Sequence, residues 1–501
     1  MEPSAPRPSP PLGLPRVAVL LLALCFIGYA AFLARNSASY AGGADSSGYF
    51  NSARLLGEGR FFGTVRMPAG HRHDEFGLGA FMPLGFILDE QLPHIAPTYP
   101  TGLPLHLLAA SWLAGWRHAS TVVNIFAALG SGLLMWSLAR RLDLTVGWAA
   151  GALLLLWLCP LTLFATLQPM SDELALLWSL AALVAVLRSR EHWRWSLLAG
   201  VATSLAVLVR PTNALLILPL ALALGWNFRS YWFLILGGLP GGAFFCYYNW
   251  KVYGSPLTTG YGDVSTAFSA GFVPHNLAHF ALWIPALLSP LVCAALAAPF
   301  VRAARRRELA VLGLWAVLLI GFYAFYFHSG ETWWYLRFIL PAFPVLILAA
   351  LVVCQRLGQL ISSPRWARVL LLAVLAVGVV WQVQLSRRLD VLNIPKSEAY
   401  YLDTANWARR YLPPESAVFF MQVSGALYFY TPFMLIRWDL VVVAKLPELL
   451  AALRAERRPV YAVLYDFESH EARERLGGRW KQIATVRNAT FWQLEADPAA
   501  P

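Results

Sequence analysis

Long apolar runs separated by short polar segments dominate the chain. Several of them approach the ~20 consecutive apolar residues that an α-helix needs to cross a bilayer. Membrane-spanning helices are predicted at eleven runs, which lie at 16–34, 120–139, 146–166, 173–187, 196–210, 212–226, 231–248, 279–300, 309–327, 338–355 and 368–385. The pattern predicts a polytopic α-helical membrane protein. The first run is too long for the apolar core of a signal peptide, so we expect it to be retained.

A twelfth apolar run, 103–116, can be placed from the charges of the loops. With eleven spans and a cytoplasmic N-terminus, the segments assigned to the cytoplasm hold 15 Arg and no Lys, whereas the short outer loops hold three basic residues. Because basic residues gather in cytoplasmic loops, this arrangement is favoured. A twelfth span would move "ARRL" and "VRAARRRE" outside. We therefore expect 103–116 to be an interfacial helix on the outer face, with Trp112 and Trp116 among the headgroups.

This topology leaves two large outer parts. One is the first outer loop, 35–119. The other is the C-terminal tail, where "AVFFMQV" and "VYAVLYD" alternate as strands do and "LPELLAALRAER" has helical spacing. We predict a cytoplasmic N-terminus of residues 1–16, a transmembrane catalytic part of residues 17–385 that includes the first outer loop, and a small extracytoplasmic α/β domain of residues 386–501.

The composition agrees with a membrane protein and excludes other classes. Of 501 residues, 58% are hydrophobic and 13% are charged, against about 25% charged residues in soluble domains. The net charge of +12 does not indicate a nucleic-acid partner, because most basic residues lie in short loops between the spans. All five Cys lie in apolar runs, so they are interpreted as small buried hydrophobic residues, with no spacing typical of zinc sites or disulfides.

Ionisable residues recur at the outer ends of the predicted spans. Such residues cost energy at membrane depth and are often functional. The first lies in "AGGADSSGYFNSARLLGEGRF", just beyond the first span, and the others open or close later spans. The outer-rim residues are Asp45, Asp172, Glu173, Arg210, Glu331 and Arg337. We expect them to lie at one depth on one face of the protein.

Each outer-rim residue also has a simpler interpretation. Asp45 could cap the helix that "DSSGYFNSARLL" predicts, although the residue three positions later is Gly rather than the Glu or Gln of a capping box. Asp172 and Glu173 could complement a helix dipole. Arg210 and Arg337 could be anchors at the headgroups. In the first outer loop, "GHRHDE" offers two His and two carboxylates as metal ligands, but its spacing favours a solvated loop.

The order Asp45, Tyr49, Ala53 and Gly57, followed by "YPTGLPLHLLAA" and a bundle of spans, resembles the GT-C membrane glycosyltransferases. Within them the chain is similar to the protein O-mannosyltransferase and aminoarabinose-transferase-like branch. The resemblance covers nearly the whole chain: the number of spans, the long first outer loop, the interfacial helix and the outer α/β domain. It implies a polyprenyl-phosphate sugar donor and an extracytoplasmic acceptor, which could be a lipid glycan, a polysaccharide or a protein.

The resemblance implies roles for the outer-rim residues. Asp45 would take the proton of the acceptor hydroxyl as general base, with inversion at the anomeric carbon. Asp172 would bind a divalent cation, Mg²⁺ or Mn²⁺, or orient the acceptor. Arg337, and after it Arg210, would bind the donor phosphate. The residues expected to position donor or acceptor are Tyr49, Tyr99, Glu173 and Glu331.

Two positions depart from the family pattern. The chain has Asp45-Ser46 where protein mannosyltransferases often carry two adjacent acids, and Arg337-Phe338 where the family often has "RY". Both departures make mannosyl transfer to protein less certain and leave generic hexosyl or pentosyl transfer unaffected.

We therefore predict an inverting, polyprenyl-phosphate-sugar-dependent glycosyltransferase. The dominance of Arg over Lys favours a bacterial protein of the inner (plasma) membrane. The main alternative is a transporter or flippase for a lipid-linked substrate. Such a protein would also have many membrane spans and charged residues at their ends. Such proteins often contain inverted repeats, and the sequence shows none. A third alternative is a scaffold or lipid-binding subunit, in which loss of Asp45 would leave function intact.

Overall fold

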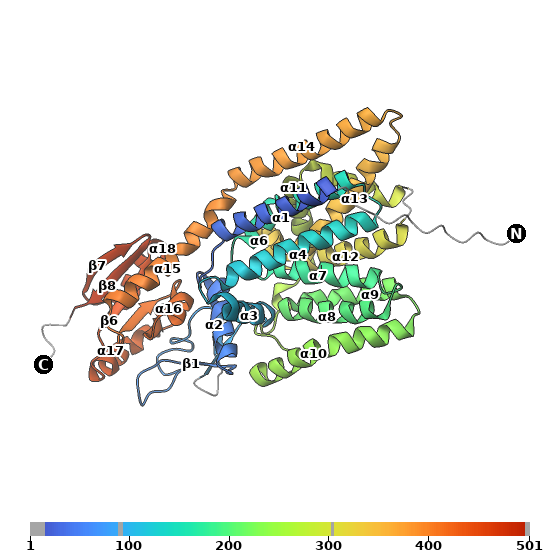
Figure 1. Ribbon diagram of the computed structural model, residues 1–501. Helices are drawn as coiled ribbons and strands as arrows, with labels where there is room; N and C mark the ends of the chain where they lie inside the picture. Colours follow the sequence, from blue (N-terminus) through green and yellow to red (C-terminus); the bar gives the residue numbers. More distant parts are fainter. Residues whose placement is uncertain (1–15, 89–93, 302–304, 496–501) are drawn as a thin grey trace.

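The computed structural model of the protein describes residues 16–88, 94–301 and 305–495. Its long helices lie side by side in a bundle, and a sheet covered by helices lies at one end (Figure 1). The first helix begins at the opposite end of the bundle from this sheet (Figure 1). The predicted cytoplasmic segment 1–16 lies outside the described residues, apart from Arg16.

Helices occupy all eleven predicted spans. In chain order they are α1 (Arg16–Asn36), α4 (Ala119–Arg141), α5 (Val146–Trp157), α6 (Pro160–Thr166), α7 (Asp172–Leu187), α8 (Trp193–Val209), α9 (Ile217–Leu224), α10 (Phe228–Tyr253), α11 (Val273–Leu288), α12 (Arg306–Ala324), α13 (Phe343–Gln359) and α14 (Pro364–Arg388). By length and composition, five helices in the described ranges can cross a membrane, or up to seven if each bent pair is one span. The number of eleven crossings therefore remains a prediction.

Two predicted spans are bent rather than straight. α5 and α6 meet at 59°, and the helical stretch 270–288 meets a 3₁₀ helix, η4 (Pro290–Phe300), at 106°. In both cases the second segment begins with proline. Proline lacks a backbone N–H and clashes with the preceding turn, so it starts a new segment instead of continuing the old one.

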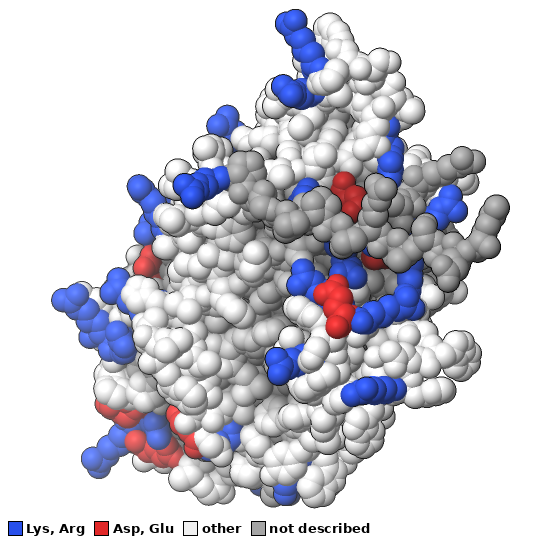
Figure 2. Space-filling model, turned by 45° about the vertical axis from the view of Figure 1, so that its right-hand side comes forward, with Lys and Arg blue, Asp and Glu red and all other residues white. Residues whose placement is uncertain are grey.

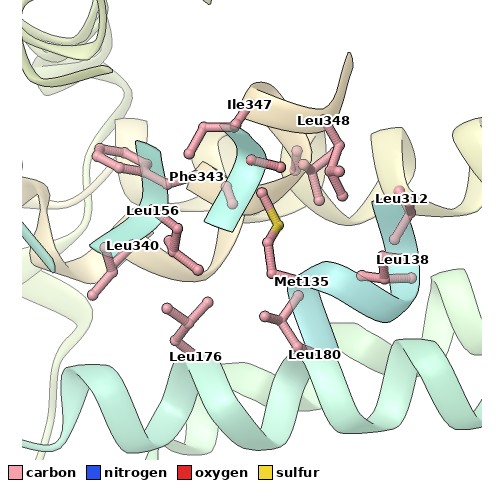
Figure 3. Packing of buried hydrophobic residues seen from close by; sticks show 14 of the residues in the cluster. Met135, Leu138, Leu156, Leu176, Leu180, Leu312, Leu340, Phe343, Ile347 and Leu348 are labelled. Carbon is pink, nitrogen blue, oxygen red and sulfur yellow. The ribbon is translucent and has the colours of Figure 1, made fainter. Parts of the chain in front are cut away.

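Apolar side chains from several helices fill the bundle. Met135 of α4 and Leu176 and Leu180 of α7 are fully buried and point into the same space between the helices (Figure 3). Phe343 of α13 belongs to the same buried cluster. Within a bilayer such interdigitation supplies van der Waals contact, because lipid tails are as apolar as leucine. Where α8 packs against α10, a Cβ on Gly200 would lie 1.9 Å from the backbone carbonyl oxygen of Leu234. Only glycine therefore permits the two helices to approach this closely.

The Arg-rich loops meet at one end of the bundle. Arg141 lies 2.8 Å from Glu191, and Arg305 lies 3.3 Å from Asp143. These contacts join three loops that the charge pattern assigns to the cytoplasm. Figure 2 shows an area left of centre without charged side chains, as expected of helices that face lipid, and groups of charged side chains at the left edge, at the bottom and right of centre. Which end of the bundle faces the cytoplasm stays a prediction.

The first outer loop contains two helices and a small antiparallel sheet. α2 (Ala44–Gly57) runs across the direction of the bundle helices (Figure 1). α3 (Gly102–Ala114) corresponds to the predicted interfacial helix, and its Trp112 is exposed. The sheet has the order β1-β3-β2, and its strands are β1 (Gly63–Thr64), β2 (Phe86–Leu88) and β3 (His94–Pro97).

The C-terminal tail forms the predicted α/β structure. Its sheet has the order β5-β4-β6-β8-β7, with β4 parallel to β5 and β6 and the remaining pairs antiparallel. The strands are β4 (Ala417–Phe420), β5 (Met434–Arg437), β6 (Val460–Tyr465), β7 (Trp480–Val486) and β8 (Ala489–Leu494). The helices are α15 (Ile394–Tyr411), α16 (Ser424–Tyr430), α17 (Leu446–Ala455) and α18 (Asp466–Leu476).

The two outer parts share one hydrophobic core. Phe76 and Phe81 of the first outer loop belong to the same buried cluster as Phe419 and Ile436 of the C-terminal sheet. The helix before this region, α14, extends to Arg388, so the boundary at residue 386 stays a prediction. This shared core fixes the C-terminal sheet against the loop that contains α2.

Candidate active site

A cavity of about 480 Å³ lies where α2, the start of α7, the end of α8 and the 3₁₀ helix η6 (Trp333–Ala342) meet. Six of the residues singled out in the sequence line it. They are Asp45, Tyr49, Tyr99, Asp172, Arg210 and Arg337. Four of the six outer-rim residues, Asp45, Asp172, Arg210 and Arg337, therefore face one cavity.

Asp45 points into the cavity from the first turn of α2. The N-cap of α2 is Gly43, so Asp45 is not the cap and its carboxylate is free for other contacts. One carboxylate oxygen accepts a hydrogen bond of 2.7 Å from the hydroxyl of Tyr99. The other accepts a hydrogen bond of 2.9 Å from the guanidinium of Arg337. The side chain of Asp45 remains 34% exposed, and that of Arg337 is 13% exposed.

The surroundings of Asp45 favour its ionised form. Partial burial opposes ionisation, but the adjacent Arg337 guanidinium and the hydrogen bond from Tyr99 outweigh it and hold the pKa of Asp45 below its ordinary value. Asp45 is therefore a carboxylate at neutral pH, the form that can accept a proton.

A second acid–base pair lies beside the first. Asp172 opens α7, and one of its oxygens accepts a 2.5 Å hydrogen bond from Arg210, which ends α8. Arg210 also donates to the hydroxyl of Ser171 and to the backbone carbonyl of Arg337. Asp172 is 1% exposed and Arg210 13% exposed, so this pair is more buried than the pair of Asp45 and Arg337.

The two guanidinium groups converge on one aromatic ring. Those of Arg210 and Arg337 each lie 5.4 Å from the ring centroid of Phe338, within the range of a cation–π contact. Two cations near one cavity form a natural receptor for an anion with several oxygens, such as a phosphate.

Sequence reasoning missed most of the aromatic lining. The missed residues include Tyr261, Tyr323, Tyr326 and Tyr335. Tyr323 stacks on Phe338 with ring centroids 5.3 Å apart and planes 12° apart. The signal was the aromatic density of "GFYAFYFHSGETWWYLRF". It is easily passed over, because aromatic residues also gather at any membrane interface.

Two predicted positioning residues are not among the described residues that line the cavity. Glu173 follows Asp172 on α7, so its side chain points to another face of the helix, where it is buried in the bundle. The carboxylate of Glu331 lies 2.8 Å from Nδ1 of His328 near the surface. Of the two residues, His328 lines the cavity.

The divalent cation predicted at Asp172 would need ligands from the described residues, from the substrate or from water. The described residues contain no group of three or more His, Cys, Asp or Glu side chains that could hold a metal ion. One oxygen of Asp172 is engaged by Arg210. In "GHRHDE", His71 pairs with Glu75, and Arg72 pairs with Asp74, as the solvated-loop interpretation expects. The metal-binding role of Asp172 therefore stays a prediction.

Solved structures share the fold over nearly the whole chain. The crystal structure of ArnT from Cupriavidus metallidurans bound to undecaprenyl phosphate has a TM-score of 0.60 and 14% identity, with 97% of this chain and 99% of that chain covered. The archaeal oligosaccharyltransferase AglB from Archaeoglobus fulgidus, in complex with an inhibitory peptide and a dolichol-phosphate, has a TM-score of 0.52 and 11% identity, with 97% and 75% covered.

A third similar structure is the arabinofuranosyltransferase AftD from Mycobacteria, with a TM-score of 0.52, 14% identity, and 97% of this chain and 42% of that chain covered. No protein-family profile matches the sequence, and no curated protein sequence matches it. The chain thus shares the fold of ArnT, AftD and AglB over nearly its whole length, which agrees with the architecture that the sequence resemblance predicted.

Proposed function

We propose that the protein is a membrane glycosyltransferase that moves a sugar from a polyprenyl-phosphate donor to an extracytoplasmic acceptor, in the inner membrane of a bacterium. The observation that carries the proposal is a cavity in a GT-C fold in which a carboxylate, Asp45, faces two guanidinium groups. Undecaprenyl phosphate bound to ArnT and dolichol-phosphate bound to AglB support a polyprenyl phosphate as the donor carrier.

In this reaction Asp45 acts as the general base. Its carboxylate takes the proton of an acceptor hydroxyl while the hydroxyl oxygen bonds to the anomeric carbon of the donor. The bond between that carbon and the phosphate oxygen breaks, and its electron pair leaves with the polyprenyl phosphate. Attack from the face opposite the leaving group inverts the anomeric carbon.

Arg337 and Arg210 stabilise the leaving group. Negative charge grows on the phosphate oxygens as the bond breaks, and cations held in place beforehand stabilise it without reorganisation. Asp172 holds Arg210 through the 2.5 Å hydrogen bond. We therefore assign Asp172 the task of orienting Arg210, and no step of the mechanism passes through a metal.

The pair of Asp45 and Arg337 links donor binding to basicity. Among the described residues, Asp45 is the acidic residue that forms an ion pair with the guanidinium of Arg337. A donor phosphate at Arg337 would take part of that positive charge and add a negative one nearby. Both changes raise the pKa of Asp45 towards its ordinary value, so the base becomes stronger once the donor is bound.

The cavity suits one sugar and its phosphate. Its volume of about 480 Å³ lies within the usual range of small-molecule sites. The aromatic walls offer flat apolar faces to the C–H groups of a pentose or hexose ring, and the two ion pairs of the lining supply its charged groups.

The test compares wild type with Asp45→Asn. Each purified protein receives undecaprenyl-phosphate-linked hexoses, pentoses and an aminopentose with a crude acceptor extract, and we measure released undecaprenyl phosphate and transferred sugar. We expect turnover by wild type and by Asp74→Asn, a matched change in the exposed part of the first outer loop, and loss in Asp45→Asn. Equal release by Asp45→Asn would assign the base elsewhere. Lipid movement in liposomes without turnover of any donor would favour the transporter.

A further inference from the structure

The C-terminal region holds the loop that leads into α2. Residues 37–43 form this loop between α1 and α2. The hydroxyl of Tyr40 donates to the backbone carbonyl of Pro395 in α15. The backbone N–H of Ala41 donates to the hydroxyl of Tyr430, at the end of α16, over 2.9 Å. The loop that carries the proposed base into the cavity is thus fixed by residues more than 350 positions away in the chain.

The N-terminus of α2 is capped by a residue from outside its own segment. Its N-cap, Gly43, has no side chain to offer. The carboxylate of Glu398, in α15, accepts a 3.0 Å hydrogen bond from the backbone N–H of Gly43 and lies 3.3 Å from the hydroxyl of Ser46. In a capping box, a Glu or Gln three residues into the helix accepts the N-cap N–H. Here that position is Ser46, and Glu398 makes the bond instead.

The close approach of Glu398 depends on glycine. A Cβ on Gly42 would lie 2.2 Å from one carboxylate oxygen of Glu398, so any side chain at this position would displace the carboxylate. The backbone N–H of Gly42 also donates to the hydroxyl of Ser46 over 3.0 Å. Two glycines, a serine hydroxyl and one remote carboxylate therefore form a single hydrogen-bonded unit around the first turn of α2.

We propose that Glu398 is a positioning residue of the transferase. By fixing the first turn of α2, it sets where the carboxylate of Asp45 lies relative to Tyr99 and Arg337. The inference rests on the proposed role of Asp45 as the base. Glu398 is not among the described residues that line the cavity, so it acts through the backbone of α2 rather than on the substrate.

Kinetics provide the first test. We expect Glu398→Ala to lower kcat about ten- to a hundredfold, the usual worth of a hydrogen bond to a charged group. The KM for the undecaprenyl-phosphate donor that wild type turns over should stay unchanged. Glu398→Gln keeps an acceptor oxygen and should recover most of the loss. Gly42→Ala should act in the same direction as Glu398→Ala. Glu471→Gln, an exposed change on α18, is the control.

Hydrogen exchange provides a readout that does not need turnover. The amides of residues 41–47 should exchange faster in Glu398→Ala than in wild type, and at the wild-type rate in Glu471→Gln. Unchanged exchange in Glu398→Ala would overturn the inference, and so would a wild-type kcat in an active preparation. A loss of kcat that Glu398→Gln does not recover, with a matching fall in melting temperature, would show general destabilisation and overturn it too. If wild type turns over no donor, the proposed function fails and the catalytic role of Glu398 fails with it, whereas the exchange rates still decide whether Glu398 fixes the first turn of α2.

Discussion

The carboxylate of Asp45 lies 2.9 Å from the guanidinium of Arg337, although 292 positions separate them in the chain. With side chains 34% and 13% exposed, the pair is neither a surface ion pair nor a fully buried one. A phosphate that enters the cavity meets the same guanidinium. In the proposed mechanism the pair is therefore the resting state, and donor binding loosens it.

Removing the charge of Asp45 should tighten phosphate binding. In Asp45→Asn the guanidinium of Arg337 is no longer shared with the carboxylate of Asp45, and the negative charge at position 45 no longer repels the phosphate. We expect undecaprenyl phosphate to bind several-fold more tightly to Asp45→Asn, and about tenfold or more weakly to Arg337→Ala. Titration calorimetry in detergent measures both, with Asp74→Asn and Arg72→Ala as exposed controls. Weaker binding by Asp45→Asn would contradict a phosphate site at Arg337.

The pH profile should reveal the lowered pKa of Asp45. The acid limb of kcat/KM reports the free enzyme, so we expect it below about pH 4, the ordinary range of Asp. The acid limb of kcat reports the complex with the donor and should lie at a higher pH, because the donor phosphate raises the pKa of Asp45. In Arg337→Ala, burial remains while the cation is lost, so the limb of kcat/KM should move towards neutral pH. A limb that stays in place in this variant would show that another group titrates.

The same pKa shift has a consequence for stability. Because the folded state lowers the pKa of Asp45, the ionised carboxylate stabilises the fold at neutral pH. This contribution is lost as the pH falls through the lowered value.

The pair of Asp172 and Arg210 should matter more for folding. Removing one partner of a buried ion pair leaves an uncompensated charge and costs about 3–5 kcal/mol. We expect Asp172→Ala and Arg210→Ala each to lower the melting temperature in detergent clearly, and the double variant to lose less than the sum of the two. Asp74→Ala, which breaks an exposed pair, should leave the melting temperature unchanged. Strictly additive losses would show that the two residues do not stabilise the fold as a pair.

Two tyrosines in the cavity should differ in their effect. The hydroxyl of Tyr99 donates to Asp45, whereas that of Tyr49 donates to Ser171. Each Phe variant keeps the ring and removes one hydroxyl. We expect Tyr99→Phe to lower kcat about tenfold, because it loses a hydrogen bond to a charged group, and Tyr49→Phe to change kcat much less. Steady-state kinetics with one active donor measure both, and equal effects would argue against Tyr99 as the partner of the base.

Much of the architecture could be predicted from local sequence. Apolar runs predicted helices wherever the bundle has them, since a run of this length has few other ways to satisfy its backbone in lipid. Alternation in "AVFFMQV" and "VYAVLYD" predicted β4 and β6. The bends after α5 and α11 were not predicted, because the apolar pattern continues across the prolines that cause them.

The candidate site was predicted in part. A charged residue at the outer end of a helix can be recognised from its position in the sequence alone. This criterion identified Asp45, Asp172, Arg210 and Arg337, and it identified Glu173 equally well. Whether such a residue faces the cavity depends on the rotation of its helix. Adjacent positions on α7 point to different faces, which is why Asp172 lines the cavity and Glu173 is buried in the bundle.

The sequence by itself determined the membrane class, the positions of the helices, the α/β character of the tail and the residue types able to carry out the chemistry, because each of these follows from composition and short-range periodicity. Only the tertiary structure decided the partners. It paired Asp45 with Arg337 and Asp172 with Arg210, and it brought Glu398 to the start of α2. These contacts join segments far apart in the chain, and they depend on how the helices pack rather than on any local pattern.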